Sequence, residues 1–253
     1  MIDVEQLARD LDEAIVQRKE IAPLTKTYGD FDLETAYRVQ ERGIALRLAR
    51  GETIAGYKMG LTSAAKRVQM NLGAPIYGLL TDTMRVEREV RVAEGVHPKI
   101  EPEIAFVTGR ELRGKISREE ALAGCSAVAP ALEILDSRFI GFKYFSLPDV
   151  VADNCSSWRF AIGPLHAPRL TGGLRMRMSL NGRVVQETDS NSISGNPIES
   201  LVQLVAMLDA HGRALPARTI VLAGAATVAE PLRPGALVSL EVESLGKMDI
   251  RAE

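Results

Sequence analysis

The chain has 253 residues, of which 46% are hydrophobic and 25% charged, as is ordinary for a globular protein. A net charge of −2 and few aromatic residues speak against a general polyanion binder and against a stacking platform for single-stranded nucleic acid. Cys125 and Cys155 make no disulfide framework and the charged N-terminus lacks a signal core, so we expect a cytoplasmic protein without a membrane partner.

The first 80 residues are predicted to be mainly helical. Apolar side chains recur at helical spacing over residues 4–15, after Asp3 as the N-cap. A second helix is predicted over residues 33–49. Short strands then follow at residues 54–59 and 76–80.

Residues 81–253 are predicted to form a β-rich body. A half-exposed strand is expected over residues 85–92, because valines alternate there with charges. Buried strands are predicted at residues 100–107 and 131–135. Between them, the run Ser117-Arg118-Glu119-Glu120 has the pattern of a capping box that opens a helix.

The last third of the chain is predicted to contain two hairpins and one helix. Asn181-Gly182 separates two strand-like runs and is a strong signal for a tight hairpin turn. A helix is predicted to begin at Asn196-Pro197. Strands are expected at residues 219–223, 237–243 and 248–251. Since strands and helices do not alternate regularly, we predict one α+β domain over residues 1–253 rather than a doubly wound sheet.

Two glutamates in the run HPKIEPEIAFV, residues 97–107, are the first candidate site. Side chains alternate across a strand, so Glu101 and Glu103 are predicted to share one face. Two like charges on an apolar strand are unfavourable unless something neutralises them, which a divalent cation can do. The alternative is a solvated strand face with two glutamates that bind nothing.

A third acid strengthens the hypothesis of a metal site. Glu133 interrupts the apolar run ALEIL over residues 131–135, and a carboxylate is almost never buried without a partner. If the two strands are neighbours, Glu133 joins Glu101 and Glu103 on one side of a cation. Mg²⁺ and Mn²⁺ prefer such oxygen ligands, and open positions would remain for water and substrate.

Lys58 is the second candidate. It lies in an apolar strand between two glycines in GYKMGLTS, residues 56–63. A lysine beside a metal could bind a substrate carboxylate or assist proton transfer, and the alternative is a surface lysine whose stem lies along the sheet. Thr62 or Ser63 could cap a short helix that ends near Met70.

A polar segment later in the chain is the third candidate. Asn154, Ser156 and Ser157 follow an apolar approach, which suits either a loop that binds a ligand or ordinary turn chemistry. Arg138 and Arg159 could each anchor a carboxylate through a bidentate contact, or could form surface ion pairs.

Six stretches occur in the order typical of a known family: GYKMGLTS (56–63), PIYG (75–78), HPKIEPEIAFV (97–107), ALEILDSR (131–138), VVADNCSSWRF (150–160) and VLAGAAT (221–227). Together they resemble the hydratase/decarboxylase branch of the fumarylacetoacetate hydrolase superfamily. The resemblance implies a mixed β-sandwich roll around the metal, with N-terminal helices. It also implies that Glu101, Glu103 and Glu133 bind Mg²⁺ or Mn²⁺ and that Lys58 is the active-site lysine.

Members of this branch either hydrate 2-hydroxypenta-2,4-dienoate or decarboxylate 2-oxo-3-hexenedioate, also named 4-oxalocrotonate, in the meta-cleavage breakdown of catechols. The hydratases carry an acidic residue after the proline of the PIYG-like stretch, where this chain has Ile76. The resemblance therefore favours a decarboxylase, with the hydratase as the alternative. A hydrolase of carbon–carbon bonds and a catalytically silent scaffold are more distant alternatives.

The matching stretches also supply weaker candidates for contact with a small 2-oxo dicarboxylate. The resemblance further implies a complex with the hydratase of the pathway, and we allow for a homo-oligomer. The candidate substrate contacts are Thr62, Ser63, Ile76, Arg138, Asn154, Ser156, Ser157 and Gly224.

Overall fold

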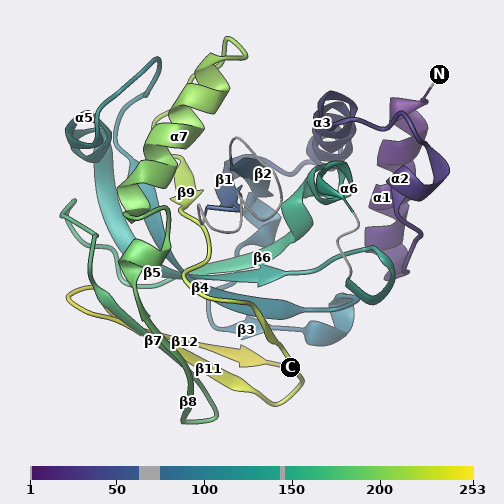
Figure 1. The fold of residues 1–253 in the computed structure, drawn as a ribbon. Helices are drawn as coiled ribbons and strands as arrows, with labels where there is room; N and C mark the ends of the chain where they lie inside the picture. The colour runs from purple at the N-terminus through teal and green to yellow at the C-terminus, as the bar shows by residue number, and fades with distance from the viewer. Residues whose placement is uncertain (1, 63–74, 143–145) are drawn as a thin grey trace.

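The N-terminal helices begin at side-chain caps, as the sequence predicts. The structure is a computed structural model that describes residues 2–62, 75–142 and 146–253. The Asp3 carboxylate accepts a hydrogen bond from the Gln6 amide, and Asp32 does the same for Thr35. The helices are α1 (Val4–Gln17), α2 (Leu24–Thr27) and α3 (Leu33–Ala49), and they lie together with α6 (Leu147–Ala152) at one end of the molecule (Figure 1).

A seven-stranded mixed sheet forms the centre of the fold. Its strands run in the order β2-β1-β9-β4-β5-β6, and β10 pairs with β4. All these pairs are antiparallel except β1 with β9. The strands are β1 (Ile54–Gly60), β2 (Ile76–Thr81), β4 (Lys99–Thr108), β5 (Cys125–Leu135), β6 (Ser157–Ile162), β9 (Ile220–Leu222) and β10 (Glu230–Pro231).

A five-stranded sheet packs against this one in the order β3-β12-β11-β7-β8. Its hairpin turn at Asn181-Gly182 is confirmed, since both residues have positive φ, 51° and 79°. The strands are β3 (Glu89–Val90), β7 (Arg175–Leu180), β8 (Arg183–Asp189), β11 (Leu237–Val242) and β12 (Gly246–Ala252).

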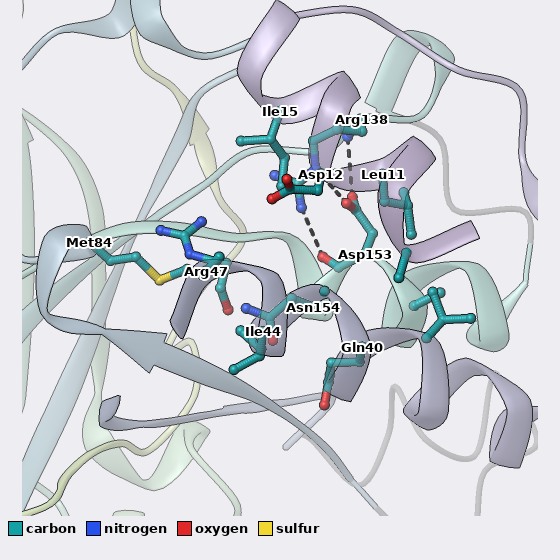
Figure 2. A pocket seen from close by; sticks show the side chains of 15 residues that line it. Leu11, Asp12, Ile15, Gln40, Ile44, Arg47, Met84, Arg138, Asp153 and Asn154 are labelled. Carbon is teal, nitrogen blue, oxygen red and sulfur yellow. Dashed lines mark hydrogen bonds and ion pairs between the residues drawn. The ribbon is translucent and has the colours of Figure 1, made fainter. Parts of the chain in front are cut away.

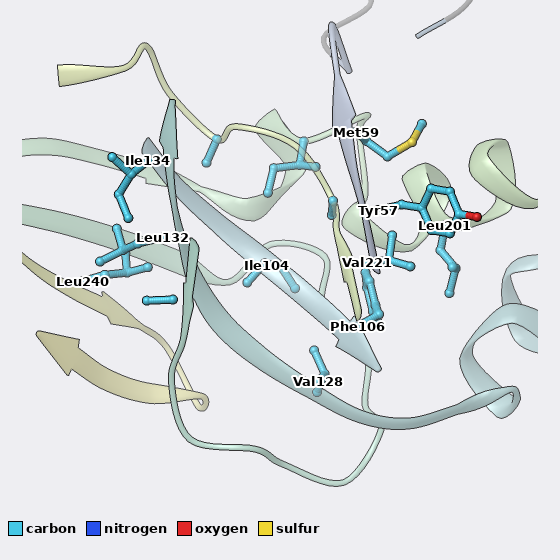
Figure 3. Packing of buried hydrophobic residues seen from close by; sticks show 14 of the residues in the cluster. Tyr57, Met59, Ile104, Phe106, Val128, Leu132, Ile134, Leu201, Val221 and Leu240 are labelled. Carbon is cyan, nitrogen blue, oxygen red and sulfur yellow. The ribbon is translucent and has the colours of Figure 1, made fainter. Parts of the chain in front are cut away.

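The main core lies on both sides of the large sheet. Figure 3 shows Leu132 of β5 beside Leu240 of the smaller sheet, whereas Phe106 and Val221 lie toward Leu201. Leu201 belongs to α7 (Pro197–Asp209), which starts at the Asn196 cap and lies near α5 (Arg118–Ala123) in Figure 1. The capping box at Ser117 is present at the start of α5. The large sheet is therefore covered on both faces, and polar groups placed on it are shielded from water.

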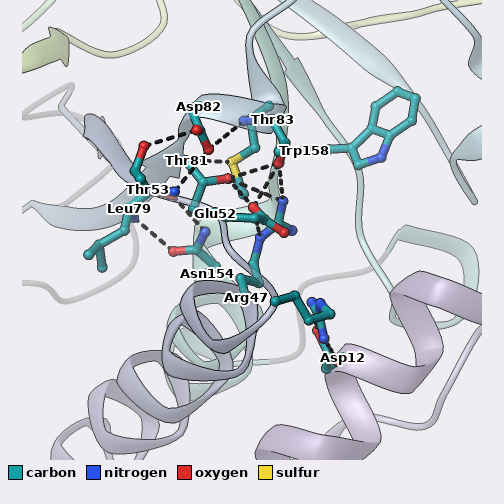
Figure 4. Close-up of polar contacts among 12 residues, drawn as sticks. Asp12, Arg47, Glu52, Thr53, Leu79, Thr81, Asp82, Thr83, Asn154 and Trp158 are labelled. Carbon is teal, nitrogen blue, oxygen red and sulfur yellow. Dashed lines mark hydrogen bonds and ion pairs between the residues drawn. The ribbon is translucent and has the colours of Figure 1, made fainter.

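The helical end has its own core and two polar attachments to the sheets. Its apolar cluster includes Ile76 of β2 and Phe139. The backbone of Ile21 forms a parallel bridge with Phe139, where the Ile21 amide donates to the Arg138 carbonyl at 2.8 Å. In Figure 4, Arg47 of α3 lies beside Thr81 of β2, and its Nη2 donates a hydrogen bond to Oγ1 of Thr81 at 3.2 Å. These contacts fix α1–α3 against one wall of the large sheet.

The α+β prediction with N-terminal helices is confirmed. The strand predicted over residues 85–92 is wrong except at Glu89–Val90, because 3₁₀ turns precede and follow that pair. The helix predicted after Thr62 or Ser63 lies outside the described residues. β1 lies within residues 1–80 and β2 begins there and ends at Thr81, yet both join the large sheet. The division of the single domain at residue 80 stays a prediction. None of the described helices has the length and apolar character needed to cross a lipid bilayer.

Candidate metal centre

The three glutamates predicted from the sequence meet on one face of the large sheet. Glu101 of β4 lies directly opposite Glu133 of β5 in the antiparallel register, and Glu103 lies two residues further along β4. Alternation along a strand therefore places all three side chains on the same face. One carboxylate oxygen from each lies within 4.8 Å of the others, and all three residues are buried.

Burial of three acids together makes their ionised state unfavourable in the absence of a cation. Desolvation raises the pKa of Glu103 well above its ordinary value, and the neighbouring Glu133 and Glu101 raise it further. Desolvation also raises the pKa of Glu133, although Lys58 acts in the opposite direction. The cluster has three carboxylates and one ammonium, so a divalent cation would balance its charge.

Two carboxylate oxygens of the cluster have the environment of metal ligands. Within the described ranges, Oε1 of Glu103 and Oε1 of Glu133 are buried and have no hydrogen-bond donor. The other oxygen of Glu103, Oε2, accepts a hydrogen bond from the Gly224 amide at 2.8 Å, which fixes the orientation of this carboxylate. Buried oxygens without donors are rare, and a hard cation such as Mg²⁺ or Mn²⁺ binds oxygens of this kind. The residues present therefore fit a divalent metal ion.

Lys58 completes the cluster from the neighbouring part of the sheet. It projects from β1, and its Nζ lies 2.9 Å from Oε2 of Glu133. The same Nζ donates a hydrogen bond to the carbonyl oxygen of Cys155 at 3.2 Å. Burial alone would lower the pKa of Lys58, but the carboxylates of Glu133 and Glu101 outweigh burial and raise this pKa. Two contacts, to Glu133 and to the Cys155 carbonyl, therefore hold Lys58 in place as the cation of the cluster.

A left-handed turn aims the Cys155 carbonyl at Lys58. Asn154, Cys155 and Ser156 have φ values of 48°, 53° and 58°, a conformation that residues other than glycine rarely adopt. The Asn154 side chain holds the turn to β2, because Nδ2 donates to the Leu79 carbonyl and Oδ1 accepts from the Leu79 amide, both at 2.8 Å (Figure 4). Gly78 permits this approach, since a Cβ there would lie 2.7 Å from the Asn154 carbonyl oxygen.

A cavity of about 420 Å³ opens beside the cluster. Of the predicted substrate contacts, Thr62 and Ile76 line it, and Gly224 packs against Thr62. Gly224 has a φ of 104°, and a Cβ at this position would lie 2.5 Å from Cγ2 of Thr62. The cavity wall consists of Lys58, Met59, Gly60, Leu61, Thr62, Ile76, Lys99, Glu101, Leu135, Phe142, Val150, Cys155, Ala225, Val228 and Ala229. Ser63 lies outside the described residues.

Arg138 lies in a different place from the glutamate cluster. Only 1% of its surface is exposed, and it pairs with Asp153 beside a second cavity of about 30 Å³ between α1 and α3 (Figure 2). Its Nη2 donates to the Asp153 carbonyl at 2.8 Å and its amide donates to the Asp153 carboxylate at 3.2 Å. Ser157 lines this second cavity too, and Ser156 is buried. Substrate contact by Arg138, Ser156 or Ser157 stays a prediction. Their positions do not favour it, because none of the three lines the larger cavity beside the glutamates.

Two residues that line the larger cavity were not predicted from the sequence. Arg159, which was predicted as a possible carboxylate anchor, has a partner within the chain instead. Lys99 and Phe142 both line the cavity. Lys99 could have been found by extending the alternation of Glu101 and Glu103 one step back, whereas nothing in the local pattern marks Phe142. Arg159 lies over the Trp158 ring and 3.3 Å from Glu94, which is an ion pair near the surface.

Comparison with known proteins gives a consistent result over the full chain. The fumarylacetoacetate (FAA) hydrolase C-terminal family model matches residues 53–252. A 4-oxalocrotonate decarboxylase from Pseudomonas sp is 45% identical over 250 residues, which cover 97% of this chain and 96% of the relative. A 2-hydroxyhexa-2,4-dienoate hydratase from Comamonas testosteroni is 32% identical over 256 residues, which cover 98% and 97% respectively.

The same relationship holds for the structure. The solved 4-oxalocrotonate decarboxylase from Pseudomonas putida G7, complexed with magnesium and adipate, superposes with a TM-score of 0.95 and is 34% identical. The match covers 99% of this chain and 97% of that chain. With its fold, its carboxylate cluster and its matched residues in agreement, the chain belongs to the fumarylacetoacetate hydrolase family.

Proposed function

We propose that this chain is a metal-dependent decarboxylase that converts 4-oxalocrotonate to 2-hydroxypenta-2,4-dienoate and CO₂. The observation that carries the proposal is the difference in full-length identity, 45% to a 4-oxalocrotonate decarboxylase against 32% to a hydratase. The magnesium and adipate in the solved relative support a divalent metal and a six-carbon dicarboxylate as ligands. We therefore include in the proposal a small 2-oxo dicarboxylate as the substrate and Mg²⁺ or Mn²⁺ as the metal.

The reaction needs a sink for the electrons of the bond that breaks. The C5–C6 bond of the substrate breaks and CO₂ leaves, and the electrons move through the C3–C4 double bond onto the C2 oxygen. A proton from solvent then completes the 2-hydroxyl group of the product. The bound divalent ion supplies a Lewis acid that stabilises this developing negative charge. No organic cofactor is required, because the carbonyl of the substrate accepts the electron pair.

The residues of the chain hold and orient the participants. Glu101, Glu103 and Glu133 would hold the metal, and the Gly224 amide keeps Glu103 in a fixed orientation. Lys58 adds positive charge at the end of the cavity where the carboxylates lie. A fixed geometry of this kind lowers the cost of reorganisation during the reaction.

The apolar wall of the cavity favours decarboxylation over hydration. Ile76 and Val150 line it, and no carboxylate other than Glu101 is found among its described lining residues. A hydratase must bind and activate a water molecule, which requires a polar group near the substrate carbons. An apolar wall limits the access of water to the substrate carbons, which disfavours the addition of water.

The decisive experiment measures CO₂ from the purified protein and 4-oxalocrotonate, first with EDTA and then after addition of Mg²⁺ or Mn²⁺. We expect CO₂ release that EDTA abolishes and either metal restores. In a parallel reaction, 2-hydroxypenta-2,4-dienoate should disappear no faster with the protein than without it. Consumption of the dienoate with no release of CO₂ from 4-oxalocrotonate would establish the hydratase instead.

The proposed product is an unstable dienol, which suggests transfer to the enzyme that hydrates it. We therefore include association with the pathway's hydratase in the proposal. Analytical ultracentrifugation of each protein alone and of their mixture tests it. A faster-sedimenting species confined to the mixture is expected, and unchanged sedimentation of both proteins would remove the complex from the proposal. The run on this chain alone reports its own oligomeric state.

A further inference from the structure

A second lysine lies in the cavity beyond the carboxylate cluster. Lys99 is the first residue of β4 and precedes Glu101 by two positions, so strand alternation places both on the same face. The two backbone positions are about 7 Å apart along the strand. Both residues line the cavity of about 420 Å³, and Lys99 is half-buried. The cavity therefore has positive charge at a point away from the predicted metal ligands.

The surroundings of Lys99 differ from those of Lys58. Lys58 forms an ion pair with Glu133, whereas none of the ion pairs between described residues includes Lys99. Instead, Nζ of Lys99 lies 4.0 Å from the centre of the Phe142 ring. A contact with the face of an aromatic ring orients an ammonium group without neutralising its charge. The other described residues of the wall are largely apolar, which strengthens the attraction of this charge for an anion.

We propose that Lys99 binds the second carboxylate of a dicarboxylate ligand and thereby selects dicarboxylates over monocarboxylates. The identity of that ligand as 4-oxalocrotonate rests on the proposed function. In an extended six-carbon diacid the two carboxyl carbons are about 6 Å apart. This length is close to the spacing of positions 99 and 101, so one carboxylate can reach the metal cluster while the other reaches Lys99.

The position of Lys99 predicts which kinetic constant depends on it. Under the proposed function, the carboxylate at Lys99 is the one that leaves as CO₂. Its charge is present in the bound substrate and diminishes as the bond breaks, so Lys99 contributes more to substrate binding than to the chemical step. A variant without this charge should raise KM without lowering kcat, because the lost interaction is stronger in the bound substrate than in the transition state.

The test compares adipate with hexanoate, which has the same carbon chain but one carboxylate. Binding to the Mg²⁺-loaded protein is measured by calorimetry for the wild type, Lys99→Met and the control Lys115→Met, whose residue is exposed. We expect Lys99→Met to weaken adipate about 10- to 100-fold, as for a charge-assisted contact, and to leave hexanoate within about 2-fold. The control should bind both like the wild type. Phe142→Leu should weaken adipate by a smaller factor than Lys99→Met.

Two outcomes would overturn the role of Lys99: equal affinity of the wild-type protein for adipate and hexanoate, or an equal loss of both ligands in Lys99→Met. Thermal melting of each variant reports whether it folds, and Lys99→Arg, which restores the charge, should recover a preference for adipate. The CO₂ assay on the wild type separates this inference from the proposed function. If the wild type releases CO₂ and Lys99→Met keeps the wild-type preference for adipate, the role of Lys99 is rejected and the proposed function stands. If the adipate preference depends on Lys99 but the wild type releases no CO₂, only the proposed reaction is rejected.

Discussion

Two groups of buried charges lie on either side of the left-handed turn at residues 154–156, and they are built differently. In the first, Glu101, Glu103 and Glu133 share one cation, Lys58. In the second, Arg138 and Asp153 form a one-to-one pair with several hydrogen bonds between them. Both groups are almost fully shielded from water. Burial alone therefore does not distinguish a functional charge from a structural one.

The difference lies in the balance of charge and in the supply of hydrogen-bond donors. The glutamate cluster has excess negative charge and buried oxygens for which the described residues provide no donor. In the Arg138–Asp153 pair the charges balance, and the cavity beside Nη1 of Arg138, which has no partner among described residues, has room for a water molecule. An incomplete cluster indicates a ligand from outside the chain, and a complete one indicates a role in stability.

The largest expected effect comes from breaking the balanced pair. Arg138→Met leaves Asp153 buried without its partner, and we expect the free energy of unfolding to decrease by about 3–5 kcal/mol. Urea unfolding measures the loss. The double variant Arg138→Met with Asp153→Leu should recover most of it, because no unpaired charge remains. A stable Arg138→Met protein that loses only adipate affinity would contradict this and assign Arg138 to the ligand.

The glutamate cluster should respond in the opposite way. Glu103→Gln removes one like charge but keeps an oxygen for the Gly224 amide, so the metal-free protein should be more stable by about 1–2 kcal/mol. Metal affinity and CO₂ release should both fall about 100-fold. Calorimetry with Mn²⁺, a CO₂ assay and thermal melting in EDTA give the three readouts. The control is Glu87→Gln, whose side chain is 76% exposed. Wild-type turnover by Glu103→Gln in EDTA would reject the metal centre.

The pH dependence of stability sharpens the comparison, because Asp153 titrates in an accessible range. Burial raises the pKa of Asp153 to about 6, above its ordinary value near 4, although Arg138 opposes the change. Between these pH values the folded chain keeps a proton that the unfolded chain releases. The free energy of unfolding should therefore decrease by about 2 kcal/mol as the pH rises from 4 to 6, with no further contribution from Asp153 above that. Unfolding of the wild type and Asp153→Asn across this range measures the difference, and parallel curves would contradict it.

The smallest effect tests the turn that joins the two groups. Asn154→Ala removes two hydrogen bonds to Leu79 and places alanine at a positive φ, so we expect a loss of about 1–2 kcal/mol in stability. Because the turn aims the Cys155 carbonyl at Lys58, turnover should also fall several-fold. Asn154→Gly keeps the backbone conformation but loses the side chain, and it should lie between the wild type and Asn154→Ala. Unchanged turnover in both variants would show that Lys58 does not depend on the turn.

The sequence predicted the parts of the structure that depend on local periodicity. The same-face placement of Glu101 and Glu103 follows from strand alternation, and the turn at Asn181-Gly182 follows from its residue types. The apolar run around Glu133 indicated a buried acid. The direct pairing of Glu101 with Glu133, however, depends on the register between two strands, and their spacing along the chain does not set that register.

Other features depend on contacts between distant segments and were not predictable. The positive φ values at Cys155 and Ser156 have no signature in residue type, since neither is glycine or asparagine. The partner of Arg138 lies 15 residues away, beyond a helix that the sequence pattern did not indicate. Phe142 reaches the cavity from a segment far from Lys99 in sequence, so neither segment alone indicates the contact between them.

The backbone bridge between Ile21 and Phe139 has a consequence for how such a protein can diversify. Phe139 begins the short segment that ends at Phe142 in the cavity wall, and its position depends on a strand-like residue from the N-terminal helical layer. The carboxylates lie on β4 and β5, which make no use of this bridge. Exchange of the N-terminal layer between homologues would thus change the support of the cavity wall at Phe142 without altering the two strands that carry the carboxylates. Chimeras that exchange residues 1–50 between homologues would test whether ligand preference changes with this wall.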